Sequence, residues 1–433
     1  MRLSRMRDRL RSSLWFVPAI FGVGAVVLAV VMVRLDRSTE SATIVGFGGG
    51  PESARSVLST VAASTITFAG LVFSITVLAL QLASGQFSPR VLRTFLRDRA
   101  GKVTLGITIG TFTYSLLVLQ SVRSEASRGG EFVPSLAVSA SLLFAIVAVG
   151  AFIQYIHHIS QSIQASRILD AVAEETTEAI ARLSQREPGA PPPTSVSWIA
   201  TCAVSHDGVV VRADEPALVD LAAANGCMFE LVPAVGDSIA DGMPLIRTTA
   251  TISGAAAREA VRAIDVAPER TMQQDVAFGL RQLVDVAERA LSPGVNDPTT
   301  AVQAIDRIHA ALRRLATVPL GQRWVADQEA QPRLSIREPA WDDLVSLGFD
   351  EIRRSGEGSL QVSRRLRAAL DDLLSVATGE RRRAIERQIQ LLDASDARSF
   401  QDPGDVEMAS VGDPQGIGGP GRADPTGAVN RTS

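Results

Sequence analysis

The sequence predicts a membrane protein with four transmembrane α-helices in its first third and a soluble α+β domain in the remainder. Four long stretches carry no charged residue, at residues 12–33, 56–89, 103–122 and 132–156, and the rest of the chain has none of this kind. At 1.5 Å per residue, each stretch is long enough to cross about 30 Å of hydrocarbon. A charge at the bilayer centre would cost about 2.5–3.5 kcal/mol, so these stretches are expected to lie in lipid.

These stretches define a transmembrane domain, residues 1–156, with spans at about residues 14–33, 59–82, 103–122 and 134–156. The first apolar stretch is too long for the core of a signal peptide and lacks a small-residue cleavage site. We therefore expect it to be retained as the first helix.

The distribution of basic residues predicts the orientation. Five arginines precede residue 12 and five basic residues lie between positions 90 and 102, whereas the other two loops carry three and two. Since basic loops stay in the cytoplasm, we expect both termini to be cytoplasmic. The Arg- and Ala-rich composition suggests a bacterial chain, and hence its inner (plasma) membrane.

The soluble part is expected to begin with a stalk helix at residues 157–187, which continues the helical pattern of the fourth span and ends at a Pro-rich linker. A small β-rich module follows at residues 196–251, with a short helix capped by Asp214. Residues 254–400 form a helical cytoplasmic domain with helical hairpins. The Gly-, Pro- and Asp-rich residues 401–433 are expected to be a disordered tail, because they cannot bury enough apolar area to offset chain entropy.

Within the β-rich module, residues 236–246 read GDSIADGMPLI and are similar to the turns of small biotinyl/lipoyl-type barrel-sandwich domains. The hairpin has no lysine to carry such a cofactor. The similarity therefore implies a small β-barrel or sandwich-like fold and no cofactor.

Two apolar stripes in the helical domain flank the segment SPGVNDP at residues 292–298. Asp297 is suited to cap a helix and Pro298 to open it, so we expect a helical hairpin here. The alternative interpretation is a small-ligand site at the helix N-terminus, where free N–H groups favour an anion.

Three segments resemble a bacterial family of predicted membrane proteins of unknown function. They are ALSPGVNDPTTA at residues 290–301, TFAGLVFSIT at 67–76 and QDVAFGLRQL at 274–283. The resemblance covers nearly the whole chain except the tail. It implies the architecture described above and no established activity. The hairpin residues that carry it are Ser292, Pro293, Gly294, Asn296, Asp297, Pro298 and Thr300.

Polar side chains follow one face of two of the predicted spans. In span two they are Thr60, Ser64, Thr67, Ser74 and Gln81, and in span three they are Thr104, Thr108, Thr111 and Ser115. One interpretation is helix–helix packing, in which small polar residues allow close approach and hydrogen bonding. The other is a water-lined conduit in an oligomer, with span two facing the axis.

The number and position of ionisable residues bear on which classes of function are possible. Arg90, Arg93 and Arg97 lie three and four residues apart below span two. They could serve topology and lipid headgroups, or form a basic mouth of a pore. The predicted spans contain no acid or base, which argues against a proton relay. A net charge of −3 gives no indication of nucleic-acid binding, and four histidines with two cysteines suggest no metal site.

These observations predict an integral membrane protein, homo-oligomeric and channel-like or transport-related, gated by its cytoplasmic domain. The alternative is a non-conducting scaffold or signalling anchor that binds partners or a small ligand. No nucleotide-binding, zinc-protease or nucleophile motif is present, so we expect no enzyme.

Overall fold

The computed structural model describes residues 15–38, 47–86, 99–123, 132–162, 165–186 and 189–418. The chain divides into two compact units, residues 1–167 and residues 168–433. Each unit is described by itself.

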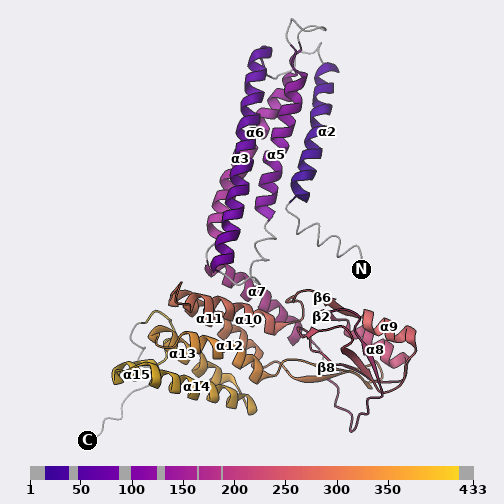
Figure 1. Ribbon diagram of the computed structural model, residues 1–433, viewed down its shortest axis with the longest axis vertical. Coiled ribbons are helices and arrows are strands. Elements are labelled where there is room, and N and C mark those ends of the chain that lie inside the picture. Colours follow the sequence, from indigo (N-terminus) through magenta and orange to yellow (C-terminus); the bar gives the residue numbers. More distant parts are fainter. Residues whose placement is uncertain are drawn as a thin grey trace. The chain divides into compact units, whose positions relative to one another are not determined.

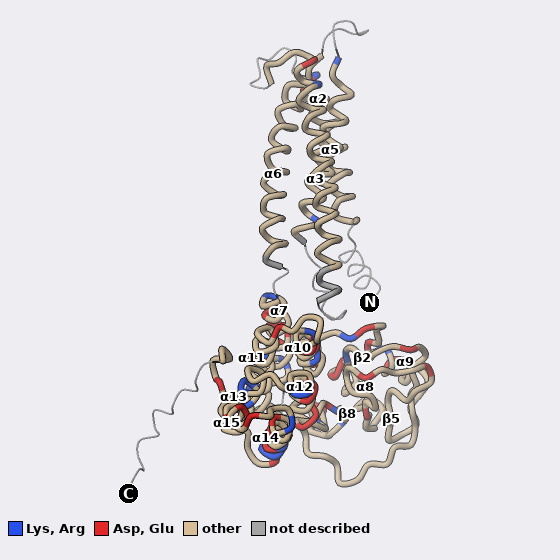
Figure 2. The backbone as a smooth tube through the Cα atoms, turned by 60° about the vertical axis from the view of Figure 1, so that its left-hand side comes forward, with Lys and Arg blue, Asp and Glu red and all other residues tan. Residues whose placement is uncertain are grey.

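The N-terminal unit is a bundle of four long helices that lie side by side (Figure 1). In the described residues, four helices are long and apolar enough to cross a membrane, as expected. They are α2 (Phe16–Ser38), α3 (Pro51–Gln86), α5 (Arg99–Ser121) and α6 (Ser135–Ser162). Their tubes are almost free of charge along their length, and Lys, Arg, Asp and Glu lie near the ends (Figure 2).

The second span begins earlier than expected. We placed its start near residue 59, but α3 begins at Pro51 and has 36 residues. Proline fits the first turn of a helix because the N–H that it lacks would have no intrahelical partner there.

Within the bundle, α5 packs against α2, α3 and α6, so it is the central helix.

The prediction of one continuous stalk helix was wrong. Residues 157–187 are divided between the end of α6 and a separate helix, α7 (Ala165–Ser184). The apolar face of α7, which includes Leu169 and Val172, is buried. A Cβ at Gly279 would lie 2.3 Å from the hydroxyl of Thr176, so α7 is in close contact with the rest of its own unit.

The C-terminal unit combines two sheets with helices. The five-stranded sheet has the order β1-β5-β3-β8-β7, and the three-stranded sheet has the order β4-β2-β6. The strands are β1 (Ala200–Ala203), β2 (Gly208–Ala213), β3 (Phe229–Leu231), β4 (Ser238–Ile239), β5 (Pro244–Thr248), β6 (Ile264–Ala267), β7 (Gln322–Ala326) and β8 (Pro332–Arg337). The helices are α8 (Glu215–Ala224), α9 (Gly254–Arg262), α10 (Val276–Leu291), α11 (Pro298–Leu315), α12 (Trp341–Ser355), α13 (Leu360–Val376), α14 (Glu380–Ser399) and α15 (Pro403–Ser410).

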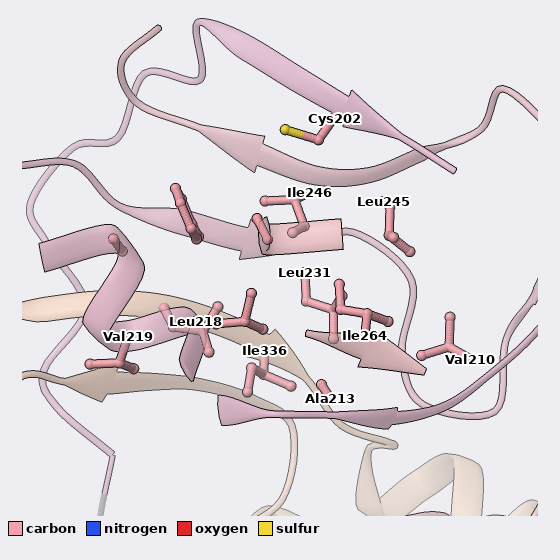
Figure 3. Packing of buried hydrophobic residues seen from close by; sticks show 14 of the residues in the cluster. Cys202, Val210, Ala213, Leu218, Val219, Leu231, Leu245, Ile246, Ile264 and Ile336 are labelled. Atoms are coloured by element: carbon pink, nitrogen blue, oxygen red, sulfur yellow. The ribbon is translucent and has the colours of Figure 1, made fainter. Parts of the chain in front are cut away.

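We expected a small β-barrel or sandwich-like fold over residues 196–251. The β-rich module forms two sheets and no closed barrel, and its predicted boundaries were too narrow. β8 pairs in parallel with β3, and β6 pairs with β2, so residues 264–267 and 322–337 complete sheets begun before residue 251. One apolar core serves both sheets: Val210 and Ile264 of one sheet pack with Leu231, Ile246 and Ile336 of the other (Figure 3). Such pairing between distant segments leaves no local pattern, which explains the error.

The helical hairpin was predicted correctly. Helices α10 and α11 follow one another, the Asp297 carboxylate accepts the N–H of Thr300, and Pro298 opens α11. The cap of α8 is also confirmed, because the Asp214 carboxylate accepts the N–H of Ala217.

The prediction of a disordered tail was wrong for its first part. Helix α15 forms at Pro403–Ser410 and packs against α13 and α14, and Ala409 is fully buried. Residues 419–433 lie outside the described residues.

Candidate functional site

The polar stripe of the third span lies inside the bundle. Thr104, Thr108, Thr111 and Ser115 on α5 are all buried. Ser115 shares a hydrogen bond of 2.8 Å with Ser141 of α6, and the hydroxyl of Thr104 donates to the carbonyl of Ala151 at 3.4 Å. These contacts are those of helix–helix packing.

Two glycines of α5 permit this packing. A Cβ at Gly106 would lie 2.8 Å from the Phe21 ring of α2, and one at Gly110 would lie 3.4 Å from the Phe21 carbonyl. The hydroxyl of Tyr114, one residue from the stripe, donates to the Ala137 carbonyl of α6 at 3.1 Å. The polar face of α5 is therefore occupied by neighbouring helices.

The polar stripe of the second span lies on the outside of the bundle. Thr60, Ser64, Thr67, Ser74 and Gln81 on α3 are all exposed, and Leu71 and Leu78 are exposed at intervening positions three and four residues away. The hydroxyls of Thr60 and Thr67 donate to the carbonyls of Ser56 and Ala63, each at 2.8 Å. We call these seven exposed residues from Thr60 to Gln81 the outer face of α3.

The opposite side of α3 is held by α6. The hydroxyls of Thr76 and Tyr155 are hydrogen-bonded at 2.7 Å, and Tyr155 also donates to the Val72 carbonyl at 3.3 Å. The rings of Phe68 and Phe152 stack with centroids 4.9 Å apart. These contacts fix the rotation of α3 so that the outer face of α3 points away from the bundle.

Sequence reasoning missed a buried carboxylate at one end of the bundle. Asp36, at the end of α2, is 9% exposed, and its two oxygens accept the N–H groups of Leu136 and Ala137, each at 3.0 Å. It thus caps the N-terminus of α6 from a residue about one hundred positions away. Capping motifs in sequence are local, so no sequence signal could reveal this contact.

The three arginines predicted to form a basic mouth, Arg90, Arg93 and Arg97, lie outside the described residues.

The residues of the signature hairpin build a turn. Asn296 adopts a left-handed conformation with φ of 49°, the Ser292 hydroxyl donates to the Arg289 carbonyl at 2.7 Å, and the Asp297 N–H donates to Ala290 at 2.8 Å. Pro293 and Gly294 are exposed at the tip. Because the Asp297 carboxylate itself binds the N–H and hydroxyl of Thr300, it occupies the position that an anion would take.

The chain matches known sequences over most of its length. The family model described as "Predicted membrane protein (DUF2254)" matches residues 11–372. The chain belongs to this family. Uncharacterized proteins of Mycobacterium bovis and Mycobacterium tuberculosis are each 36% identical over 429 residues, which cover 94% of this chain and 80% of theirs. No solved structure matches the chain.

Membership of the DUF2254 family confirms the resemblance seen in the sequence. Together with the four apolar helices it identifies a membrane protein.

The C-terminal unit of this DUF2254 protein contains a cavity of about 740 Å³ between α7 and the segment that joins β2 to α8. Arg182, Arg212 and Asp214 line it, with Gln274. Sites for small molecules are commonly about 300–1,000 Å³. The volume of the cavity falls in this range, although its mouth is open to solvent.

Beside this cavity lies a network of four charged side chains. Glu215 pairs with Arg186 at 3.2 Å and with Arg323 at 2.6 Å, and Arg186 also pairs with Glu338. Burial raises the pKa of Glu338, and the neighbouring Arg186 and Arg323 guanidinium groups oppose this shift. The network joins the end of the α7 segment to α8, β7 and the end of β8.

Proposed function

We propose that this protein is a homo-oligomeric, channel-like protein of the bacterial inner membrane, in which α3 of each copy lines a common axis. In this proposal both termini are cytoplasmic and the C-terminal unit controls opening. The chain has no catalytic role in it. The single observation that carries the proposal is the outer face of α3.

The two polar stripes have the same residue types but different surroundings. The stripe of α5 is buried by its own bundle, whereas the outer face of α3 is exposed along the full described span. Hydroxyl and amide groups gain nothing from contact with lipid tails, and they are stabilised by water or by another helix. Several copies that place this face around an axis would supply that water.

The leucines on the same face support gating. Leu71 and Leu78 alternate with Thr67, Ser74 and Gln81 at intervals of three and four residues. Rings of apolar side chains in a pore close it to water when they approach one another. The proposal therefore places polar and apolar rings in alternation along the axis.

The cavity beside α7 supports a sensing role for the C-terminal unit. It has the size of a small-ligand site, and α7 begins three residues after α6, the fourth membrane helix, ends. A ligand that favours one position of α7 would bias the bundle by its difference in affinity for the two states.

Ion flux through liposomes that contain the purified protein tests the proposal. We expect flux in the native protein, and loss of most of it in Ser74→Leu and Gln81→Leu, because leucine removes the polar groups from the outer face of α3. Ile66→Leu is the matched control, since Ile66 is exposed on α3 about 100° around the helix from this face. Absence of flux from the native protein under every condition would exclude a channel, and a monomeric mass in nanodiscs would exclude the shared axis.

A specific observation favours a second candidate, the non-conducting scaffold. Thr60 and Thr67 donate to carbonyls of their own helix, so these hydroxyls do not require water. The outer face of α3 would then be a dry contact between copies, and the C-terminal unit would bind partners or a small ligand. An oligomer without flux would support this candidate.

A further inference from the structure

The last described segment of the chain, residues 402–418, lies against α13 although its composition predicts disorder. It contains four acids and no lysine or arginine, and six of its residues are glycine or proline. We call it the C-terminal strap. In Figure 1 its helix, α15, lies beside α13 and α14, in agreement with their contacts.

A buried arginine holds the C-terminal strap. Arg364 of α13 is only 2% exposed, and its Nε donates to the Val411 carbonyl at 3.0 Å while Nη1 donates to the Gly418 carbonyl at 3.4 Å. The N–H of Asp413 donates in turn to the Arg364 carbonyl at 3.0 Å. The amide of Gln361, also on α13, donates to the Gly416 carbonyl at 2.7 Å.

Within the strap, Asp413 organises the loop that meets this arginine. Its two carboxylate oxygens accept the N–H groups of Gln415 at 3.0 Å and Gly418 at 2.7 Å. Burial alone would raise the pKa of Asp413, but these N–H groups and the Arg364 guanidinium hold it below its ordinary value. The ionised form is therefore the one that docks.

Close backbone approach makes the fit specific. A Cβ at Gly412 would lie 3.0 Å from the Cα of Ala368 on α13, and a Cβ at Gly416 would lie 2.5 Å from a methyl group of Val302 on α11. The surface of α11 and α13 under the strap therefore accepts a segment with glycine at these two positions.

Apolar contacts contribute little to this docking. Ala409 is fully buried, but Met408, Val411 and Ile417 are 47%, 47% and 74% exposed. Ordering a glycine-rich segment costs conformational entropy. The docking then depends on hydrogen bonds and charge, which water and salt can replace.

We propose that the C-terminal strap docks reversibly and masks a binding surface for an acidic, glycine-containing peptide segment, centred on Arg364 and Gln361. The strap is the occupant in the closed state. An acidic segment of a partner protein takes its place when the strap is released. This inference is independent of whether the membrane bundle conducts.

The test uses the full-length protein in nanodiscs and a fluorescent synthetic peptide with the sequence of residues 402–418. Gly412→Val places a branched side chain against the backbone of α13 and should release the strap without changing the surface beneath it. We expect the Gly412→Val protein to bind the peptide at least about tenfold more tightly than the native protein, whose binding surface is uncovered only in a minor fraction of molecules. Asp405→Asn is the control, since this acid is exposed on the strap, and it should behave like the native protein.

The surface is tested by changing α13 in the Gly412→Val protein. Arg364→Gln should weaken peptide binding by about tenfold or more, because two hydrogen bonds from a charged group are lost. Gln361→Ala, a milder change, should weaken binding by about fivefold. Binding should also weaken as the salt concentration rises.

Three results would overturn the proposal. Equal binding to the native and Gly412→Val proteins would show that the strap masks nothing. No binding to either protein would show that this surface does not accept such a peptide. Binding that is unchanged by both Arg364→Gln and Gln361→Ala would place the peptide elsewhere.

Discussion

Removal of the Asp36 carboxylate should destabilise the membrane bundle. In Asp36→Ala, the N–H groups of Leu136 and Ala137 lose their acceptors. Ala137 is fully buried, so water cannot replace the lost bond there, whereas Leu136 is only partly buried. A lost N-cap costs about 0.5–2 kcal/mol, and a buried N–H without a partner costs about 1–3 kcal/mol. We expect a loss of about 2–3 kcal/mol, since the two costs overlap at Ala137.

Two further variants make this measurement specific. Asp36→Asn keeps one carbonyl oxygen as an acceptor and should lose about half as much. Ser38→Ala lies at the same helix end. Its exposed hydroxyl donates to the Leu35 carbonyl of its own helix, so the change should alter stability by less than about 0.5 kcal/mol. Equilibrium unfolding in mixed detergent micelles gives the free energies. If Asp36→Ala were no less stable than Ser38→Ala, the capping argument would be refuted.

Three other predictions concern the C-terminal unit and its unfolding free energy. Gly279→Val should destabilise the unit by about 1–3 kcal/mol, because the added side chain would overpack against Thr176. Gly294→Ala is the control and should have little effect, since no atom lies near that position. Equal effects of the two variants would contradict close packing of α7 against α10. Burial raises the pKa of Asp396, so ionisation of this carboxyl group opposes folding. The unfolding free energy of the native protein, relative to that of Asp396→Asn, should therefore fall as the pH rises above about 4. A difference in unfolding free energy that does not change with pH would contradict this. Asp297→Ala should cost about 1 kcal/mol in chemical denaturation as the cap of α11 is lost, and an unchanged midpoint would show that the turn does not need it.

The features that were predicted correctly depend on neighbouring residues. A charge-free stretch is a local property, as are the helix start at Asp297 and Pro298 and the cap at Asp214. Each of these features depends on residues within about one to six helical turns of one another, so the local sequence is enough to predict it.

The features that were missed depend on residues far apart. The parallel pairing of β3 with β8 joins segments about one hundred residues apart, and Asp36 caps α6 over a similar separation. The order of the C-terminal strap depends on Arg364, a residue that composition alone assigns to the surface of a helix. In each case the stabilising partner comes from another element, and a single sequence does not state which elements meet.

The two polar stripes of the bundle show the same limit at the site itself. Spans two and three both carry hydroxyl groups three, four or seven residues apart, and the sequence left packing and conduit open for both. The structure separates them because α5 has neighbours on three sides and α3 is held on one side, by the Tyr155 and Phe152 contacts of α6 and by α5. The regular spacing of polar residues along an apolar helix therefore indicates a role only when the neighbours of that helix in the bundle are known. In the proposed channel, substitutions on the outer face of α3, and not on the face of α5, should change conduction without changing folding.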